Sequence, residues 1–517
     1  MRRHPHLYEV NARIFLRRVS DKYRRSLTLA TIPDEEWQGL AQRGFDLLWP
    51  MGVWQRSPGA REQALVNEFL RREYDRVLPG WTPEDVAGSP YAIYNYSLDP
   101  ALGRRGDLAQ FKSRLNRLGL GLILDFVPNH LAADHPWVLA HPEWFVQGGE
   151  AEARTYPDWF FSPVSDIYLA HVKDPNLPPW PEAVRMGVSL TDLAHGRDPN
   201  FPPWSDTIQL NFYSIGLRQA LIDQLLLVSE VADGVRCDMA MLALNEVFGR
   251  VWEDMLQDYP PPRTEFWTEA IGRVKEKRPD FLFLAEAYWG LEGKLQQLGF
   301  DFTYDKVLYD RLRYAAPGDI RGHLMADSGY QEHSARFIEN HDEPRAAVAF
   351  GRERSLAAAL ITATIPGLHL FHDGQFEGRS IRLPVQLVRE PGEAVDHEMV
   401  QFYERLLEIT SAPAFHQGEW RLLPVSLAWE GNESYHNLLA WSWRSAGNLK
   451  VVVVNYSPHQ SQCRLPLPLP PEITERLIFK DELTGAVYVR DPAEVSHRGL
   501  YVDLKPYQAH VLDTTAG

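Results

Sequence analysis

Three carboxylate residues lie far apart in the chain, each at the end of a short, mainly apolar segment. Asp238 ends the segment GVRCD, Glu286 ends FLAE and Asp342 ends FIENHD. Glycoside hydrolysis needs one carboxylate to attack the anomeric carbon and one carboxyl group to protonate the departing oxygen. The three acids together therefore predict an enzyme that cleaves a glycosidic bond.

The same segments indicate how the acids are tuned. Alternate side chains of a strand share a face, so Arg236 and Asp238 are expected side by side. A guanidinium lowers the pKa of a neighbouring carboxyl group, which predicts an ionised nucleophile at Asp238. Burial beside another carboxylate raises the pKa of Glu286 toward that of a general acid. Any one of these acids alone is more simply a salt-bridge or solvated residue, and it is their occurrence together at strand ends that favours catalysis.

Apolar strand segments alternate with amphipathic helical segments over nearly four hundred residues, which is typical of βα units. Carboxylates at the ends of several buried strands are how a (β/α)8 barrel builds its active site. We therefore predict an α/β protein with a TIM barrel. The strands are expected near 8–16, 45–53, 120–127, 234–240, 281–288, 300–305, 334–341 and 367–373.

The predicted barrel is interrupted once and followed by a different kind of domain. Residues 1–130 and 212–414 are expected to form the barrel. The connection after the third strand, 131–211, is too long for a loop and predicts an inserted domain. From 415 to 517 short alternating strands separated by Gly, Asn and Pro predict an antiparallel β domain.

Composition excludes several other functions. The formal net charge of −16 argues against a nucleic acid as partner, because a polyanion would be repelled. No apolar run approaches the roughly 18 residues of a membrane span, and the N-terminal segment lacks a secretory signal, so we expect no membrane and a cytoplasmic location. The two cysteines, Cys237 and Cys463, predict neither a disulfide framework nor a cysteine metal site.

A resemblance to a known family appears at this point. The segment LILDFVPNH (122–130) and the three acid-bearing segments resemble the four ordered motifs of the α-amylase superfamily, glycoside hydrolase family thirteen. The resemblance extends from about Tyr8 into the C-terminal domain. It implies a (β/α)8 barrel, an inserted domain after strand 3, a C-terminal antiparallel β-sandwich, and retention of configuration at an α-glucosidic bond.

Residue by residue, the resemblance implies a role for each matching position. Asp238 would be the nucleophile, Glu286 the general acid/base, and Asp342 a ligand of the sugar hydroxyls. Arg236 would orient the nucleophile. The remaining positions are His130 and His341, which would bind the sugar in the cleavage subsite, Tyr91, which would stack on it, and Asp125, which would support the first-motif strand end. Retention requires the carboxyl groups of Asp238 and Glu286 to lie about 5 to 5.5 Å apart.

The chain also departs from the family pattern. Met241 and Leu242 stand where many starch-hydrolysing members carry Lys-His at the leaving-group subsites. Ser89 replaces the amylase histidine, and Gly88 replaces the acidic residue by which exo-acting α-glucosidases grip a terminal glucose. Asn129 matches a residue that often ligates a structural Ca²⁺. Because a hard cation needs several oxygen donors that the sequence does not identify, calcium and an ordinary loop-capping Asn both remain open.

These observations leave the type of reaction open. The leading hypothesis is a retaining glycoside hydrolase of maltooligosaccharides or related α-glucosides, which needs no cofactor. The alternative is an α-glucan transglycosylase, a glucosyl- or maltosyltransferase, or a trehalose-related enzyme, because all of these share the glycosyl-enzyme intermediate. A non-catalytic carbohydrate-binding member is the third hypothesis. A metal-dependent hydrolase is disfavoured, since the 18 histidines form no convincing ligand set.

Overall fold

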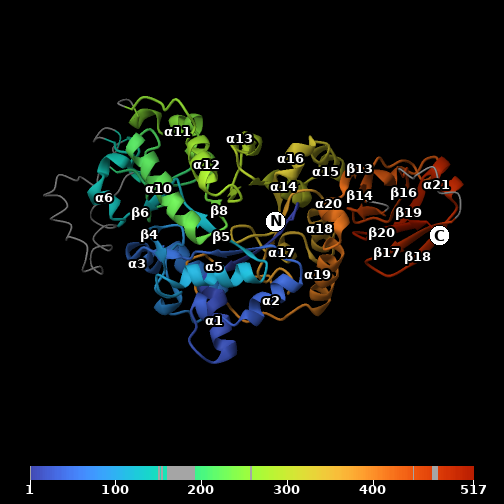
Figure 1. Cartoon of the computed structure of the whole chain (residues 1–517), viewed down its shortest axis with the longest axis horizontal. Coiled ribbons are helices and arrows are strands. Elements are labelled where there is room, and N and C mark those ends of the chain that lie inside the picture. The colour runs from blue at the N-terminus through green and yellow to red at the C-terminus, as the bar shows by residue number, and fades with distance from the viewer. Residues whose placement is uncertain are drawn as a thin grey trace.

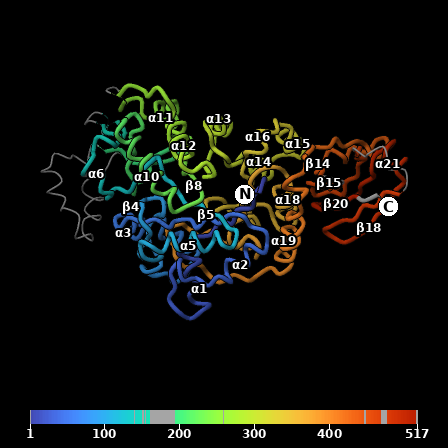
Figure 2. The backbone as a smooth tube through the Cα atoms, viewed as in Figure 1, coloured from blue at the N-terminus to red at the C-terminus, as the bar shows by residue number. Residues whose placement is uncertain are grey.

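The structure is a computed structural model of the chain, and it describes residues 2–148, 152, 155–159, 193–256, 259–445, 448–467 and 476–516. Figures 1 and 2 show two parts along the longest axis, a larger N-terminal part of strands and helices and a smaller C-terminal part built mainly of strands.

Eight parallel strands close into a barrel. In order around it they are β1 (His6–Asn11), β12 (Leu368–His372), β11 (Ser334–Arg336), β10 (Phe302–Tyr304), β9 (Leu282–Ala285), β8 (Gly234–Cys237), β5 (Gly121–Phe126) and β2 (Leu47–Met51). Nearly all their residues are buried, as expected for strands packed inside and out. Each strand overlaps the segment that the sequence predicts for it, so the predicted TIM barrel is confirmed.

The first strand is shorter than predicted, because 12–16 belongs to a helix. The side chain of Asn11 accepts hydrogen bonds from the backbone N–H groups of Arg13 and Ile14 at 3.2 Å, and this cap starts α1 (Ala12–Tyr23). The apolar run that suggested a strand forms the buried face of α1. A short apolar run does not distinguish a strand from a buried helical turn, which accounts for the error.

Helices surround the barrel in Figure 1. The longer ones are α1, α2 (Asp34–Gln42), α5 (Asp107–Arg117), α10 (Ile215–Val231), α12 (Phe266–Lys277), α14 (Lys306–Tyr314), α18 (Arg352–Thr364) and α19 (His397–Thr410). Further helices are α3 (Pro58–Val66), α4 (Glu68–Val77), α6 (Trp137–Ala140), α11 (Asn245–Val251), α13 (Glu292–Gln297), α15 (Pro317–Leu324), α16 (Ser328–Glu332), α17 (Ala346–Ala349), α20 (Pro413–Gln417) and α21 (Pro492–Arg498). The apolar faces of most of them pack on the barrel in one continuous core, whereas α3 and α4 pack in small separate clusters and α21 packs in the C-terminal domain.

Close strand packing fixes the start of β8. A Cβ atom added to Gly234 would lie 2.7 Å from the side chains of Ile123 and Leu282, on the two neighbouring strands. Only glycine therefore fits there without movement of β5 or β9. This glycine brings the strand that carries Arg236 against both neighbours.

The connection after β5 begins and ends on one small ladder. β6 (His130–Ala132) pairs antiparallel with β7 (Thr207–Gln209), with His130 opposite Gln209. The segment between them is the predicted inserted domain, and most of it lies outside the described residues. A second antiparallel pair, β3 (Trp54–Arg56) with β4 (Ile93–Leu98), lies between β2 and α5 in sequence. The boundaries of the inserted domain stay a prediction.

The C-terminal part is antiparallel, as predicted. A six-stranded sheet has the order β13 (Glu419–Leu422), β14 (Leu438–Ser445), β15 (Asn448–Asn455), β20 (Ala509–Ala516), β17 (Leu477–Asp481) and β18 (Val487–Arg490). A second sheet pairs β16 (Ser461–Leu465) with β19 (Leu500–Leu504). Residues of both sheets share one apolar core, which makes a sandwich.

Two tryptophans join this domain to the barrel. The indole N–H groups of Trp441 and Trp443 donate to the carbonyl of Thr364 at 3.0 and 2.7 Å, at the end of α18. Both rings are buried. The C-terminal domain is thus attached through a helix of the barrel wall.

Within the described residues, no helix has the length and apolar character needed to cross a membrane. Cys237 and Cys463 are both free thiols and both buried.

Candidate active site

Four segments bring their polar residues to the carboxyl ends of the barrel strands. Asp125 lies near the end of β5, Arg236 lies in β8, and Glu286 directly follows β9. The segment after β11 carries His341 and Asp342. The barrel therefore collects at one mouth the residues that the sequence scatters over more than two hundred positions.

A buried arginine holds two of the acids. Nη1 of Arg236 donates to Oδ1 of Asp238 at 2.5 Å, and Nη2 donates to Oε2 of Glu286 at 2.7 Å. The Arg236 side chain is fully buried, and its guanidinium carbon lies 5.3 Å from the ring centre of Trp49 and 5.2 Å from that of Tyr91. One guanidinium thus sets the two carboxyl groups next to each other. The separation of about 5 to 5.5 Å between them stays a prediction.

The electrostatics of Asp238 differ from the sequence expectation. Burial raises the pKa of its carboxyl above the ordinary value, and the charge and hydrogen bond of Arg236 only partly oppose that rise. The expectation of a lowered pKa was wrong because it weighed the guanidinium without the loss of water. Asp238 is 6% exposed.

Glu286 has the raised pKa expected of a general acid. Burial raises its pKa to about 7, Arg236 opposes the rise, and the negative charges of Asp238 and Asp342 add to it. A group with this pKa is partly protonated at neutral pH and can both give and take a proton.

Three donors surround the Glu286 carboxyl group. Besides Arg236, the backbone N–H of Met239 donates to Oε2 at 2.8 Å, and the hydroxyl of Tyr288 donates to Oε1 at 2.6 Å. Met239 has φ +41°, a left-handed conformation that is uncommon for a residue with a long side chain. The turn after Asp238 therefore aims a backbone donor at Glu286 at the cost of local strain.

Asp342 lies in a chain of hydrogen bonds with His341. Nε2 of His341 lies 2.9 Å from Oδ2 of Asp342 and 2.7 Å from the hydroxyl of Tyr91, whose ring stacks on the imidazole at 26°. Nδ1 of His341 faces Oε1 of Glu9 at 2.5 Å. Although burial opposes it, the two carboxylates hold the pKa of His341 well above its ordinary value.

Asp342 is the most accessible of the three acids, with its side chain 48% exposed. Desolvation would raise the pKa of Asp342, but the charge and hydrogen bond of His341 outweigh it and lower the pKa to about 2. Asp342 is therefore ionised throughout the neutral range, and it faces the open side of the site.

Asp125 lies beneath the arginine. Its carboxylate accepts hydrogen bonds from the indole N–H of Trp49 at 3.2 Å and the backbone N–H of Gly52 at 3.0 Å, and it lies 3.9 Å from Nη1 of Arg236. Asp125 is buried, and burial raises the pKa of its carboxyl group. These contacts fit the supporting role that the sequence assigns to it.

The part of the chain that carries these residues matches a known protein family. The family model for the alpha-amylase catalytic domain matches residues 82–379, which is more than half of the chain. The chain belongs to the alpha-amylase family. All four motif segments lie inside the matched range.

Individual relatives in the alpha-amylase family are distant. The chain is 27% identical over 286 residues to alpha-amylase MalA of Haloarcula japonica, covering 54% of this chain and 34% of the relative. It is 24% identical over 517 residues to an alpha-1,4-glucan:maltose-1-phosphate maltosyltransferase of Streptomyces coelicolor, covering 91% of this chain and 62% of the relative. The first three curated relatives are matched over 34%, 54% and 55% of their own lengths.

Solved structures agree on the fold. A maltogenic alpha-amylase from Thermotoga neapolitana superposes with a TM-score of 0.66 at 19% identity, covering 99% of this chain and 98% of the other. An alpha-amylase from H. orenii gives a TM-score of 0.66 at 17% identity with both chains fully covered. At this identity the likeness establishes the barrel and its C-terminal domain.

The two remaining motif residues of the first segment are buried beside the site. The imidazole of His130 lies 5.0 Å from the ring of Trp204 and donates a hydrogen bond to the backbone of Tyr91. Burial lowers the pKa of His130 to about 3, so its ring is neutral. The structure therefore brings His130 next to Tyr91.

Asn129 makes no contact that indicates a cation. Its side-chain oxygen accepts a hydrogen bond from Nε2 of Gln209 at 3.0 Å, and its amide nitrogen lies 3.3 Å from Nδ1 of His130. Among the described residues, no group of three or more His, Cys, Asp or Glu side chains is arranged to hold a metal ion. A role of Asn129 in binding Ca²⁺ stays a prediction.

The departures from the family pattern have structural reasons. Gly88 has φ +79°, and a Cβ atom there would lie 2.8 Å from the backbone nitrogen of Arg61, so no acidic side chain fits at this position. Met241 and Leu242 are buried, at 0% and 2% exposure. Neither residue is placed to make polar contacts with a leaving group.

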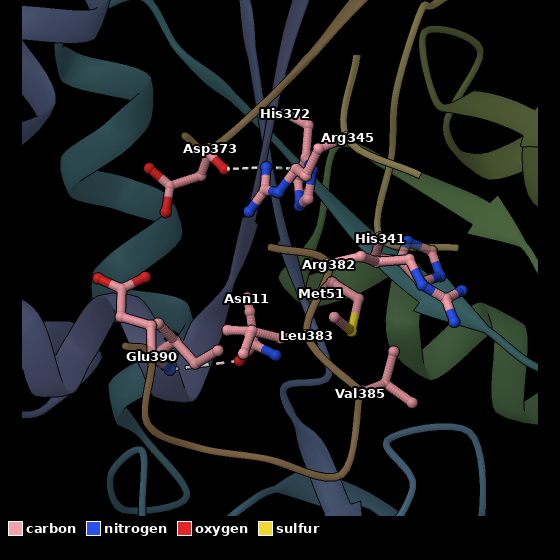
Figure 3. Close-up of a pocket in the computed structure, with 11 residues that line it drawn as sticks. Asn11, Met51, His341, Arg345, His372, Asp373, Arg382, Leu383, Val385 and Glu390 are labelled. Carbon is pink, nitrogen blue, oxygen red and sulfur yellow. Dashed lines mark hydrogen bonds between the residues drawn. The ribbon is translucent and has the colours of Figure 1, made fainter. Parts of the chain in front are cut away.

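A small pocket adjoins the site at His341. Figure 3 shows the pocket between the ends of β1, β2 and β12 and the segment that follows β12. Its charged and polar lining consists of Asn11, Arg345, His372, Asp373, Arg382 and Glu390. Nη1 of Arg382 donates to the backbone carbonyl of Asp342 at 2.6 Å, which ties the pocket wall to the catalytic segment.

The sequence interpretation missed two residues of this site. Glu9, which is fully buried in β1, and Tyr288, two positions after Glu286, both contact motif residues. Glu9 carried a usable signal, because a carboxylate inside the apolar segment LYEV needs a partner to be buried. Tyr288 carried none beyond its nearness to Glu286 in the sequence.

Proposed function

We propose that this chain cleaves α-glucosidic bonds with retention of configuration, through a covalent glycosyl-enzyme intermediate. The observation that carries the proposal is the attachment of Asp238 and Glu286 to the two terminal nitrogens of one buried guanidinium. This arrangement holds a nucleophile and a proton donor next to each other, as retention requires. Membership in the alpha-amylase family supports α-linked glucose as the substrate.

Each acid has one role in the proposed first step. A carboxylate oxygen of Asp238 forms a bond to the anomeric carbon as the glycosidic C–O bond breaks. The proton of Glu286 passes to the departing oxygen, which leaves as a neutral hydroxyl. Ionised Asp342 binds sugar hydroxyls on the accessible side and stabilises the positive charge of the oxocarbenium-like transition state.

The second step reverses the proton transfer. The acceptor oxygen forms a bond to the anomeric carbon, the bond to Asp238 breaks, and the acceptor proton returns to Glu286. A pKa of about 7 suits a group that must be acid in one step and base in the next. Two inversions at the same carbon give net retention.

Residues around the charged pair supply the sugar contacts. We propose that the Tyr91 ring stacks on the glucosyl unit being transferred, with His130 and His341 at its hydroxyls. The next sugar on the donor side then lies against the open side of the pocket beyond His341, where Arg382 and Asn11 can donate hydrogen bonds.

Transglycosylation is the second candidate. The relatives include proteins named as alpha-amylases and proteins named as maltosyltransferases, and both reactions use the same intermediate. The burial of Met241 and Leu242 removes polar contacts at two leaving-group positions, which favours an acceptor other than a long starch chain. Trehalose-related chemistry belongs to this group.

One experiment separates these candidates. The protein is incubated with maltooligosaccharides, trehalose, sucrose and α-maltose 1-phosphate, with and without glucose or maltose as acceptor, and products are followed by chromatography and by ¹H NMR of the first-formed anomer. Free sugar in the α configuration supports a retaining hydrolase, and longer or isomerised saccharides support a transferase. Absence of turnover on every α-glucoside, together with binding that Asp238→Asn leaves unchanged, would establish a non-catalytic carbohydrate-binding protein.

We propose a cytoplasmic location as well. Two free, buried cysteines agree with a reducing compartment. Fractionation of cells that express the full-length protein tests this.

A further inference from the structure

The hydrogen bonds of Glu286 determine which of its oxygens carries the proton. Oε2 receives two N–H donors, from Arg236 and from the backbone of Met239, at 2.7 and 2.8 Å. Neither group can accept a hydrogen bond in return. A proton on Oε2 would point at one of these donors and break that contact, so the transferable proton belongs on Oε1.

Oε1 faces a partner of a different kind. The Tyr288 hydroxyl lies 2.6 Å from it, and a phenol hydroxyl can both donate and accept. When Glu286 is ionised, Tyr288 donates to Oε1. When Glu286 is protonated, the phenol oxygen can accept from it or turn its own hydrogen away.

We infer that Tyr288 is a positioning residue for proton transfer, which keeps the transferable proton of Glu286 on Oε1 and stabilises the carboxylate that remains after the proton has left. This inference rests on the proposed function. In the first step the proton moves from Oε1 to the glycosidic oxygen as the glycosidic bond breaks. The hydroxyl of Tyr288 then donates to the new carboxylate, and in the second step it yields Oε1 to the acceptor proton.

The charged groups around Glu286 determine how strongly the hydrogen bond from Tyr288 affects its pKa. The charged and titratable groups that face it are Arg236 and Asp238 from the end of β8, Asp342 from the segment after β11, Tyr304 from β10 and Tyr288 itself. Asp238 and Asp342 disfavour a negative charge on Glu286, while Arg236 and Tyr288 favour it. Removal of the phenol hydroxyl therefore leaves the repulsion and removes one of the three donors that offset it.

The test is Tyr288→Phe, with Tyr314→Phe as the matched control. Tyr314 is 72% exposed on α14, and the control removes the same atom there. The pKa of Glu286 is measured directly by ¹³C NMR of carboxyl-labelled glutamate, with the resonance assigned by its loss in Glu286→Gln. We expect Tyr288→Phe to raise this pKa by about one unit, because a hydrogen bond to the charged form is lost. Tyr314→Phe should leave it unchanged.

Kinetics supply the second measurement. In Tyr288→Phe the alkaline limb of the pH profile of kcat/KM should move up by the same amount. Glycosylation should slow about tenfold for maltotriose, whose leaving group needs a proton, and much less for α-maltosyl fluoride, whose leaving group does not. If Tyr288 had a purely structural role, its replacement would lower the glycosylation rates of both substrates equally and would leave the pH profile unchanged.

A near-isosteric replacement guards against misfolding. 3,5-Difluorotyrosine at position 288 is a stronger donor of nearly the same size, and it should lower the pKa of Glu286. If neither replacement moves the Glu286 titration, the inference is wrong. If the wild-type protein turns over no α-glucoside, the proposed function fails, while the NMR titration still decides the role of Tyr288.

Discussion

Nδ1 of His341 lies 2.5 Å from Oε1 of Glu9 and joins the segment after β11 to the fully buried carboxylate of β1. The opposite side of the same ring contacts Tyr91 and Asp342. Glu9 therefore influences Tyr91 and Asp342 through His341, without contacting either of them. It fixes the ring orientation and keeps the imidazole charged, so that both nitrogens are donors.

Replacement of Glu9 by Gln should lower both stability and activity. The charged His341 would lose its buried counter-ion, which costs about 3 kcal/mol of unfolding free energy. Urea denaturation at pH 7 measures this. The exposed pair of Glu68 and Arg72 supplies the control, since Glu68→Gln should cost less than about 0.5 kcal/mol. A stable Glu9→Gln variant with unchanged kcat/KM would contradict the assigned role.

Neutralising the catalytic acids should abolish turnover without unfolding the chain. We expect Asp238→Asn and Glu286→Gln each to reduce kcat by about 10⁴-fold or more for a substrate with a poor leaving group. Both variants should keep the folded circular-dichroism spectrum, but Asp238→Asn should lower the unfolding free energy, because the buried Arg236 loses one of its counter-ions. Asp238→Ala with added azide should yield a glycosyl azide of inverted configuration. Recovery of the retained azide instead would exclude Asp238 as the nucleophile.

Gly88 should not tolerate a side chain. Its positive φ and the 2.8 Å approach to Arg61 predict that Gly88→Ala lowers the unfolding free energy by about 2 kcal/mol. Gly39, in the interior of α2 with no atom within 4 Å of its Cβ position, is the control. Gly39→Ala should raise stability by about 0.5 to 1 kcal/mol. Equal effects of the two changes, measured by urea denaturation, would refute the steric explanation for the missing acid.

A buried histidine cluster at the amino-terminal ends of β1 and β12 predicts acid lability. Burial lowers the pKa of His4 and of His369 to about 3, and it also lowers that of His6 and His416. Because the unfolded chain binds protons more readily here, this stability is complete above about pH 6.5 and is lost as the pH falls toward 3. Each such histidine contributes a slope of about 1.4 kcal/mol per pH unit.

The change His369→Gln isolates this contribution. Carboxyl groups with a raised pKa, such as Glu286, make stability fall as the pH rises, which opposes the effect of the histidines. The unfolding free energies of wild type and variant are therefore measured by urea denaturation at pH 5.0 and 6.5, and their difference is compared between the two pH values. The unfolding free energy of the variant should rise with pH less steeply than that of the wild type, by about 1.4 kcal/mol per pH unit. Parallel stability curves for the two proteins would argue against a neutral buried His369.

Arg382 should contribute to the binding of donor substrates that are longer than one glucosyl unit. Its guanidinium lines the pocket beyond His341 and contacts the protein at the carbonyl of Asp342. For Arg382→Ala we expect KM to rise about tenfold for 4-nitrophenyl α-maltoside and to change little for 4-nitrophenyl α-glucoside, since loss of a charged hydrogen bond of this kind costs about that factor. Equal changes for both substrates would place the pocket outside the donor path.

The sequence was sufficient for the barrel and for the residues at its mouth, because each strand combines a short apolar run with a polar end. Asp238, Glu286 and Asp342 were found in this way. The sign of the Asp238 pKa shift was not predictable, since it depends on how far burial outweighs Arg236. The contact between Glu9 and His341 joins residues 332 positions apart, and no local pattern encodes such a pair.

The three-pair ladder of β6 with β7 has an evolutionary consequence. The inserted segment begins after β6 and ends before β7, and these two strands are paired with each other. His130 lies on β6, and Gln209 lies opposite it on β7. Insertions or exchanges within such a bracketed module leave the rest of the architecture in register, so new specificities can be acquired while the chemistry is inherited intact.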